Sequence, residues 1–404
     1  MFSRNTKQPL RAASLGEGGK RRHIGRIIGI AFIVIFLAGG VFAYFKLDTL
    51  AGKVSLGGTS LLGNIVKSLP GVEKELKGEK AGRINVLLLG MRGEGVAGGG
   101  TLADTIMVLS IHPSSGKDGD MAKASLVSVP RDLWVQVPGR EEHRKINAVY
   151  ALGRERSEVG GMEDMRTVVG TVTGLDIPYA IAINFQGFKD LVNAVGGVTV
   201  HLDQPFEEGV QFRGLEQRCD LVRYTVPSGK QEVKKGVRRD GSVYYRHYDL
   251  CFEKITPAVL SGLECGGDFK LPAGDTLLDG DKALCYARSR DASSDFARAR
   301  RQQEIINLIR KKALSLGTLT DFSRVSALMD TLGKNVHTDM ELWEVERLYN
   351  LYQKTGEIPL TQKVLEDSEE GMLYAPEVTA DRGYILLPRG ENYDRIQEFF
   401  RSIP

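Results

Sequence analysis

Five arginines lie within fourteen positions of the stretch "YARSRDASSDFARARRQQ", which runs from Tyr286 to Gln303. Only Asp291 and Asp295 accompany them, so the stretch has a net charge of +3. Guanidinium groups stay protonated at physiological pH, and a cluster of them requires anionic groups among the side chains. Their planar, bidentate donors suit phosphate, so we predict a phosphate-binding site. The arginines are Arg288, Arg290, Arg298, Arg300 and Arg301.

A helix is predicted from Ala297 onward, and its phase turns part of the cluster inward. At about 100° per residue, the apolar stripe of this helix continues at its first turn as polar side chains. We expect Arg298, Arg301 and Gln302 to point inward with Ile305, Leu308 and Ile309. The opposite, solvent side is expected to hold Arg300, Gln303, Glu304, Arg310 and Lys311.

The segment before this helix, "KALCYARSR", is predicted to be a strand whose end carries Arg288 and Arg290 on one face. Anionic ligands commonly bind at strand ends and helix N-termini of open α/β sheets. A network of salt bridges with Asp291 and Asp295 is the alternative, but two acids cannot neutralise five arginines. We therefore favour an inward phosphate clamp.

Further candidates follow other predicted strands. Arg131 comes after a strand in "SVPRD", Asp104 immediately precedes one in "LADTIM", and Lys145 opens "KINAVYALG". Phosphate chemistry often uses a divalent cation, for which Asp and Glu oxygens are the usual ligands. The chain has no HExxH, GxSxG or GxxxxGK[ST] motif, which argues against a zinc hydrolase, a serine hydrolase and a P-loop nucleotide site.

Apolar runs alternate with helical patterns, which favours the α/β class with helices on both faces of the sheet. "RINVLLLG" is the first predicted strand, followed by "TIMVLSI" and "ASLVSV". Then come a helix in "MEDMRTVVGTVTG" that ends at Gly174, a strand in "IPYAIAINF", a helix in "FKDLVNAVGG" and a strand in "VTVHL". After a polar insert at about 206–270, "DMELWEVERLYNLYQ" is a predicted helix, "GYILLP" a final strand and "NYDRIQEFFRSI" a closing helix.

The N-terminus predicts a membrane anchor. Residues 27–45 contain no charged side chain over nineteen positions, close to the roughly 20 residues that span a bilayer. The basic residues 1–26 are expected to stay in the cytoplasm, with everything after the apolar run outside. Residues 46–80 are predicted to be a linker, and residues 81–404 the folded domain. A cleaved signal peptide is the alternative, although the apolar run is longer than a typical signal sequence.

Cysteine usage and charge agree with an extracytoplasmic domain. One disulfide is expected among Cys219, Cys251 and Cys265 in the insert, while Cys285 stands apart in "ALCYA". The absence of CxxC spacing argues against a structural zinc site. The net charge of +3 is small for 404 residues, so no nucleic-acid partner is predicted.

Seven ordered motifs resemble the LytR-CpsA-Psr family of membrane-anchored envelope phosphotransferases. They are "INVLLLG", "ADTIMVLSI", "SVPRDLWV", "KINAVYALG", "NFQGFKDLVNAVGGVTV", "LLDGDKALCYARSR" and "DFARARRQQ". The resemblance implies an α-β-α fold around a central mixed sheet. It also implies an enzyme that transfers a glycopolymer from a polyprenyl-pyrophosphate carrier to a cell-wall acceptor, usually peptidoglycan, through a phosphodiester.

The resemblance implies specific site residues as well. Arginines of the family hold the pyrophosphate, and they correspond here to Arg131, Arg288, Arg290 and Arg298, with Gln302 beside them. Arg92, Arg301 and Lys145 are further substrate-binding candidates, and Asp132 or Asp295 is expected to accept the proton of the attacking hydroxyl. A Mg²⁺ (or Mn²⁺) ligand corresponds to Asp104.

Two positions depart from the family pattern. Arg92 stands where the family often has the first metal-binding Asp, so Glu94 is the remaining candidate for that role. Leu102 stands where an arginine is common. A non-catalytic regulator that binds polyprenyl phosphate, and a hydrolase of the pyrophosphate, are therefore the alternatives to a transferase.

Overall fold

A computed structural model describes most of the chain after residue 73. The described residues are 74–94, 100–113, 122–208, 217–220, 225–253, 264–267, 269–290, 293–315, 332–355, 358–379 and 382–404. The expected basic tail 1–26, the apolar run 27–45, most of the linker 46–80 and Asp291 lie outside them. Within the described ranges, no helix has the length and apolar character needed to cross a membrane.

The centre of the fold is a six-stranded sheet in the order β14-β6-β1-β2-β3-β15. β1 pairs in parallel with β6 and antiparallel with β2, while β3 pairs antiparallel with β2 and in parallel with β15. The predicted mixed sheet is confirmed. Its strands are β1 (Ile84–Met91), β2 (Thr105–His112), β3 (Lys123–Ser128), β6 (Tyr179–Asn184), β14 (Val336–Thr338) and β15 (Leu360–Val364).

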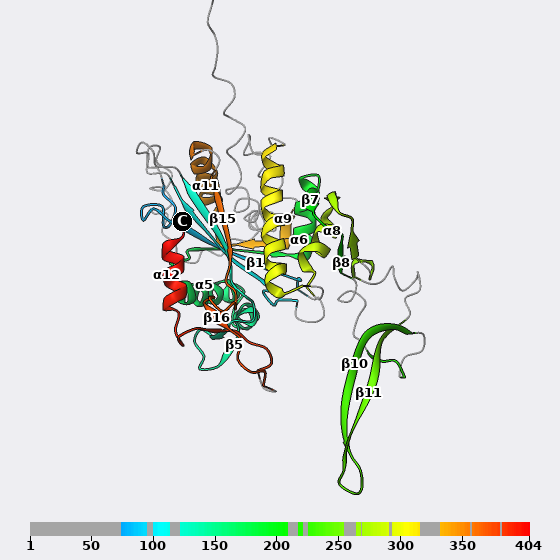
Figure 1. The fold of residues 1–404 in the computed structure, drawn as a ribbon. Coiled ribbons are helices and arrows are strands. Elements are labelled where there is room, and N and C mark those ends of the chain that lie inside the picture. Colours follow the sequence, from blue (N-terminus) through cyan, green and yellow to red (C-terminus); the bar gives the residue numbers. More distant parts are fainter. Residues whose placement is uncertain are drawn as a thin grey trace, which may run out of the picture.

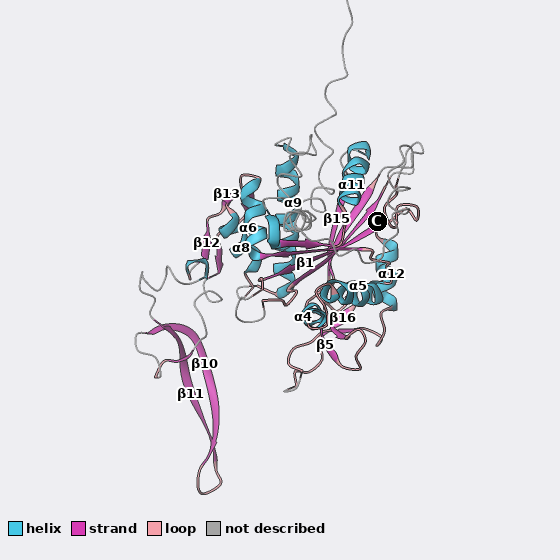
Figure 2. Ribbon diagram, turned by 180° about the vertical axis from the view of Figure 1, so that it is seen from behind, coloured by secondary structure: helices cyan, strands magenta, loops and turns pink. Residues whose placement is uncertain are grey.

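Helices cover both faces of this sheet (Figure 1; Figure 2). Neighbouring residues of β1 point into opposite cores: Val86 packs on one side and Leu87 on the other, each fully buried. This explains the continuous apolar run of the sequence, because a strand covered on both faces has no solvent side. One layer holds α6 (Phe185–Ala194), α8 (Gly280–Arg288), α9 (Asp295–Ser315) and α11 (Leu342–Thr355); the other holds α4 (Val149–Arg154), α5 (Gly160–Thr173) and α12 (Asp394–Ser402).

Most predicted elements are confirmed, but the segment before α9 is not a strand. "KALCYARSR" forms the helix α8 and the turn after it, so Arg288 ends a helix and Arg290 lies in the following loop. Asp279 caps the start of this helix, and its side chain accepts a hydrogen bond from the Lys282 backbone N–H at 2.9 Å. The i, i+2 argument for these two arginines is therefore wrong.

The predicted solvent side of α9 is also partly wrong. Gln303 and Arg310 are buried, with 3% and 6% of their surface exposed. Gln303 Nε2 donates to Ser128 Oγ and to the Lys363 carbonyl, both at 2.7 Å. The reason is β15, a strand of polar residues that the sequence analysis did not identify and that α9 packs against.

Smaller elements surround this body. "VTVHL" forms β7 (Val198–Leu202), which pairs with β13 (Gly274–Leu278) and not with the central sheet. Only two residues of "GYILLP" form a strand, β17 (Leu387–Pro388), which pairs with β16 (Leu373–Tyr374). The remaining short elements are β4 (Trp134–Gln136) with β5 (His143–Lys145), β8 (Phe206–Glu208) with β12 (Phe269–Leu271), and the 3-10 turns Ile146–Ala148, Glu264–Gly266 and Gly333–Asn335.

The described end of the linker packs on the body. Leu76 is 3% exposed within the main core, and the Lys77 backbone N–H donates to the Tyr179 hydroxyl at 2.9 Å. Arg347 of α11 forms an ion pair with Glu79 at 2.7 Å. The ordered domain therefore begins before residue 81.

The insert contains a long hairpin formed by β10 (Thr225–Val237) and β11 (Val243–Glu253), with β9 (Gln217–Arg218) beside β11. Two disulfides are present, Cys219–Cys251 and Cys265–Cys285. A disulfide among the first three cysteines is confirmed, but Cys285 is not a lone thiol. Because Cys285 lies in α8, the second disulfide links the insert to the helix that carries Arg288.

Candidate functional site

One edge of the sheet gathers the predicted site residues. β1, β3, β6 and β15 run in the same direction, so their carboxyl ends meet at this edge, and β2 begins there. At this edge Arg92 follows β1, Phe185 follows β6, and Asp104 immediately precedes β2. Arg131 is the third residue after the end of β3. Ligand sites of open α/β sheets form in such places.

Arg131 lies between three carboxylates. Its Nη1 donates to Asp104 Oδ1 at 2.8 Å, and its Nε lies 3.5 Å from Asp295 and 3.6 Å from Asp132. Burial alone would lower the pKa of this guanidinium, but the carboxylates of Asp104, Asp295 and Asp132 outweigh burial and raise the pKa. Arg131 is therefore held as a fixed cation at the carboxyl edge.

Arg298, in the first turn of α9, is the most deeply buried arginine of the site, with 7% of its surface exposed. Its Nη2 donates to Asp295 at 2.9 Å and to the Asp104 carbonyl at 3.4 Å. Burial lowers the pKa of Arg298 to about 10, opposed by Asp295 and assisted by the neighbouring charge of Arg131. This cation is incompletely compensated by the protein.

The Nε–H groups of both arginines are buried, and neither has a hydrogen-bond partner in the described part of the chain. Buried polar groups of this kind are rare, because desolvation without a partner costs free energy. Both arginines line a pocket that, with its mouth, encloses about 290 Å³. Its other lining residues include Asp104, Asp295, Gln302 and the strand-end residues Ser128 to Pro130.

Arg288 and Arg290 reach the site from the end of α8 and the loop beyond it. The Arg288 guanidinium lies 4.6 Å from the ring centroid of Phe185, the residue that follows β6. Arg290 is exposed, and its charge contributes to the lowered pKa of Arg298. The structure thus brings Arg131 and Arg298 together in one pocket, with the charge of Arg290 acting on Arg298, and places Arg288 beside Phe185.

Arg301 and Gln302 connect α9 to α8. Arg301 donates from Nε to the Tyr286 carbonyl at 3.1 Å and from Nη2 to the Ser289 carbonyl and to Ser293 Oγ. Gln302 Nε2 donates to the Ala287 carbonyl at 3.2 Å, and the residue also lines the pocket. These contacts of Arg301 therefore fix the loop that carries Arg290.

Lys145, Arg92 and Asp132 border the site. Lys145 Nζ lies 2.6 Å from Asp132 Oδ1, so these two candidates neutralise each other. The carbonyl of Arg92 accepts a hydrogen bond from the Phe185 backbone N–H at 3.3 Å, which joins the ends of β1 and β6. Asp295 lines the pocket, which makes it the better placed of the two candidate bases.

The two candidate metal ligands do not have the same surroundings. Glu94 pairs with Arg154 at 2.6 Å, and its side chain is 63% exposed. Asp104 Oδ1 accepts from Arg131 and, at 3.3 Å, from Asn147 Nδ2, while no described residue donates to Oδ2. The described part of the chain contains no group of three His, Cys, Asp or Glu side chains suited to a metal ion. Mg²⁺ commonly uses one or two carboxylates together with substrate phosphates, and Asp104 fits that pattern.

Sequence reasoning missed Tyr384 and Asn147. Burial and the carboxylates of Asp367, Asp132 and Asp295 raise the pKa of Tyr384 to about 12, and its hydroxyl donates to Asp367 Oδ2 at 3.4 Å. The backbone N–H of Leu386 donates to the Asp132 carbonyl at 2.9 Å, so the chain around Tyr384 supports the Arg131 loop. No local pattern in "GYILLP" signals this, because the contact joins segments about 250 residues apart.

Comparisons with known proteins concern the family and the fold of the chain. The model of the LytR_cpsA_psr family matches residues 64–374. The polyisoprenyl-teichoic acid–peptidoglycan teichoic acid transferase TagU of Bacillus mycoides (strain KBAB4) is 26% identical over 359 residues, covering 84% of this chain and 88% of the relative.

Two solved structures share the fold. The crystal structure of B. subtilis TagV has a TM-score of 0.50 at 20% identity, covering 79% of this chain and 96% of that one. The structure of TagT bound to LIIa-WTA has a TM-score of 0.51 at 19% identity, covering 82% and 93%.

Proposed function

Because the chain belongs to the LytR_cpsA_psr family, we propose that it transfers a glycopolymer from a polyprenyl-pyrophosphate carrier to a peptidoglycan acceptor. One observation carries this proposal: Arg131 and Arg298 border the same pocket, and each has a buried Nε–H that makes no hydrogen bond with any described residue. A pyrophosphate supplies the acceptor oxygens that these donors need. The name of the Bacillus mycoides relative, a teichoic acid transferase, supports this substrate class.

The reaction joins the sugar to the wall by a phosphodiester. A hydroxyl of the acceptor attacks the phosphorus that carries the glycopolymer, and the bond from this phosphorus to the bridging oxygen breaks. Polyprenyl phosphate leaves with the electron pair, and Asp295 accepts the hydroxyl proton. Arg131, Arg288, Arg290 and Arg298 stabilise the charge that develops on the phosphate oxygens, as fixed donors do in other phosphoryl transfers.

We propose that Mg²⁺ (or Mn²⁺) assists through Asp104, whose Oδ2 accepts no hydrogen bond from a described residue. Asp104 would hold the cation together with oxygens of the substrate, and the cation would supply neutralisation of phosphate charge. Glu94 is a poorer second ligand, because it is exposed and pairs with Arg154.

We further propose a single-pass membrane protein with its N-terminus in the cytoplasm and its catalytic domain outside. The apolar run 27–45, preceded by basic residues, supports the anchor and its orientation. Two disulfides in the described domain support an oxidising compartment. The lipid carrier then reaches the site from the same membrane.

A transfer assay tests the proposed reaction. The full chain in detergent is incubated with a polyprenyl-pyrophosphate glycan, Mg²⁺ and a peptidoglycan oligomer, and the products are separated by mass. We expect a covalent glycan–peptidoglycan product, reduced at least about 100-fold by Arg131→Ala, because a lost electrostatic donor typically costs two to three orders of magnitude.

Arg300→Ala is the control, because Arg300 is an exposed arginine of α9, the helix that carries Arg298, and pairs with Glu366. Full activity is expected for this variant. Tight binding of the carrier lipid without product would favour the non-catalytic regulator. Arg92, which stands in place of a metal-binding Asp, is the residue that supports this alternative. Release of free glycan phosphate without transfer would favour the hydrolase.

A further inference from the structure

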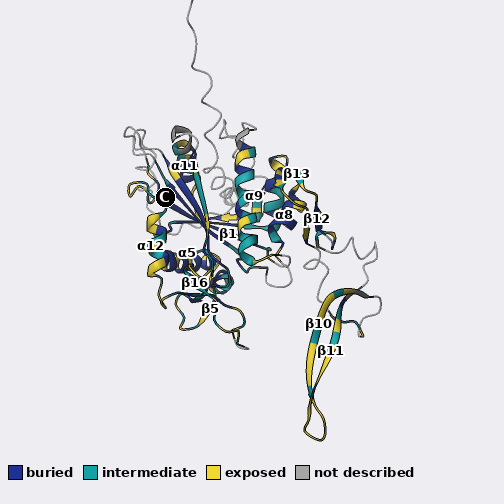
Figure 3. Ribbon diagram, viewed as in Figure 1, coloured by how far each residue is buried: buried dark blue, intermediate teal, exposed yellow. Residues whose placement is uncertain are grey.

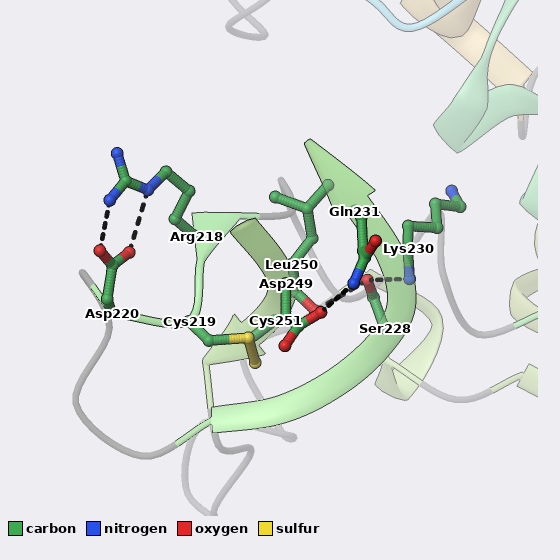
Figure 4. The surroundings of a disulfide bond; sticks show 9 residues. All are labelled: Arg218, Cys219, Asp220, Ser228, Lys230, Gln231, Asp249, Leu250 and Cys251. Carbon is green, nitrogen blue, oxygen red and sulfur yellow. Dashed lines mark hydrogen bonds and ion pairs between the residues drawn. A yellow bond between two sulfur atoms is a disulfide. The ribbon is translucent and has the colours of Figure 1, made fainter. Parts of the chain in front are cut away.

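The hairpin β10/β11 extends away from the body (Figure 1; Figure 2). It is held at its base by the Cys219–Cys251 disulfide, next to a hydrogen bond from Gln231 Nε2 to Asp249 at 2.7 Å (Figure 4). Neither the pocket nor its arginines involve this hairpin. The pocket therefore does not explain why the chain carries a disulfide-bonded hairpin with strands of 13 and 11 residues.

The strand register separates the hairpin into two faces, because residues paired across the strands point to the same side. Val233 pairs with His247, Lys235 with Tyr245, and Val237 with Val243. We call these six residues the front face, and all six are exposed (Figure 3). Its apolar members are 53%, 64%, 47% and 61% exposed for Val233, Val237, Val243 and Tyr245.

These four make up half of the large hydrophobic side chains that are exposed in the described part of the chain. Single exposed apolar residues are ordinary, whereas a group of them on one face marks an interaction site.

The tyrosine rings of the rear face are covered by arginine side chains of the hairpin and of β9. Arg218 lies 3.4 Å from the ring centroid of Tyr248, and Arg238 and Arg246 lie 5.5 and 5.6 Å from that of Tyr244. Gly236 seats the Tyr244 ring, since a Cβ there would lie 2.4 Å from it. Both tyrosines are half-buried as a result. The two faces therefore differ: the tyrosine rings of the rear face pack against the protein itself, whereas the side chains of the front face are exposed to solvent.

Charge narrows the choice of partner. Between Lys230 and Asp249 the hairpin has six basic and three acidic side chains, a net charge of +3. Two hairpins packed against each other would repel through this net charge, and the charged tip, with Arg238, Arg239 and Asp240, opposes insertion into lipid. Lysines along β10 also oppose pairing of its free edge with another strand. An acidic partner complements this charge and would be steered toward it.

We propose that the front face docks a protein whose surface has an apolar strip bordered by acidic side chains. Seven residues of β10, from Gln231 to Val237, span about 23 Å at roughly 3.3 Å per residue. A ribbon of this size buries less than a standard interface, so the complex is transient, with a Kd in the micromolar range. This role is separate from the transfer reaction and brings the enzyme to a partner in the envelope.

Site-specific photocrosslinking in the native host tests this inference. The full chain receives p-benzoylphenylalanine in place of Tyr245 on the front face or, as the matched control, in place of Tyr244 on the rear face. Both positions are tyrosines, adjacent in sequence and opposite in direction. We expect one protein adduct from position 245 and at least tenfold less from position 244.

Binding by the purified partner completes the test. The adduct is identified by mass spectrometry, and the purified protein is titrated against the full chain at two salt concentrations. We expect micromolar binding that weakens with salt and falls at least fivefold in Tyr245→Ser, because truncating an interface aromatic usually has an effect of this size. Mapping of the Cys219–Cys251 disulfide in each variant verifies that the hairpin is folded.

Four results would overturn the inference: no adduct at position 245, equal adducts at both positions, an adduct to a second copy of the chain, or an adduct to lipid or glycan. Salt-independent binding would also refute the charge argument. An unchanged transfer activity in Tyr245→Ser separates this inference from the proposed reaction.

Discussion

Replacing Arg298 with methionine is expected to stabilise the protein while abolishing transfer. Arg298 is 7% exposed, and burial lowers its pKa from 12.5 to about 10. At neutral pH the Arg298 side chain is charged in both the folded and the unfolded chain. The folded state is therefore destabilised by the full free energy that corresponds to the lowered pKa. At about 1.4 kcal/mol per pH unit this difference is on the order of 3 kcal/mol.

The gain in Arg298→Met is smaller than this figure. The substitution also removes the 2.9 Å hydrogen bond to Asp295, which keeps Arg131 as a neighbour at 3.5 Å. Replacing buried charges with apolar side chains of similar size is often neutral or stabilising by roughly 1 to 4 kcal/mol. We therefore expect the free energy of unfolding to rise by about 1 to 3 kcal/mol.

Urea unfolding of the full chain in detergent, with and without 1 mM pyrophosphate, measures both effects. The wild-type chain is expected to gain stability from the anion, because a ligand that binds only the folded state stabilises it. Arg298→Met is expected to gain little and to show no transfer. Arg300→Met is the control, and its stability is expected to change by less than about 0.5 kcal/mol. A loss of more than about 2 kcal/mol in Arg298→Met would refute the reasoning and identify Arg298 as the centre of a structural salt-bridge network.

Two further predictions concern the elements that support the site. Glu304 accepts a hydrogen bond from Tyr286 at 3.1 Å, and burial raises the pKa of its carboxyl group. The contribution of Glu304 to folding stability is therefore complete below pH 4.5, the ordinary pKa, and is lost as the pH rises through the raised pKa of the folded state. Glu304→Gln keeps the acceptor, so its stability relative to wild type should increase between pH 4 and pH 7 in urea titrations, and a constant difference would argue against this. Removing the Cys265–Cys285 disulfide by Cys265→Ser with Cys285→Ala should cost up to about 3 kcal/mol, as expected for a loop of this length. Transfer by this double variant should fall, because α8 is held less firmly. Cys219→Ser with Cys251→Ala is the control and should leave transfer unchanged. Equal transfer by the two double variants would contradict this role of α8.

The sequence predicted the sheet and its two helical layers because burial on both faces leaves an unmistakable apolar run. In β1 every residue from Ile84 to Leu89 is buried, so local composition and tertiary position agree. The helix α8 was misread because a short apolar run fits a strand or a buried helix equally well. The side-chain cap at Asp279 was the signal that distinguishes the two.

Arg288 and Arg290 reach the site from α8 and the loop beyond it, not from a strand end. The position of Arg131 beyond a parallel strand and the inward phase of Arg298 in α9 could nevertheless be predicted. The partners of each arginine could not. Arg301 donates to backbone carbonyls of α8 and the loop beyond it, and Gln303 is buried against β15, a strand too polar to be recognised from its residues. Disulfide pairing has the same limit, since Cys265 and Cys285 come together only through the fold.

A crystal structure of the full chain with a polyprenyl-pyrophosphate analogue measures the position of the anion directly. We predict phosphate oxygens within about 3 Å of the Nε atoms of both Arg131 and Arg298, at the carboxyl edge of β1 and β3. A diphosphate bound elsewhere, with those two Nε–H groups still unpaired, would contradict the central claim.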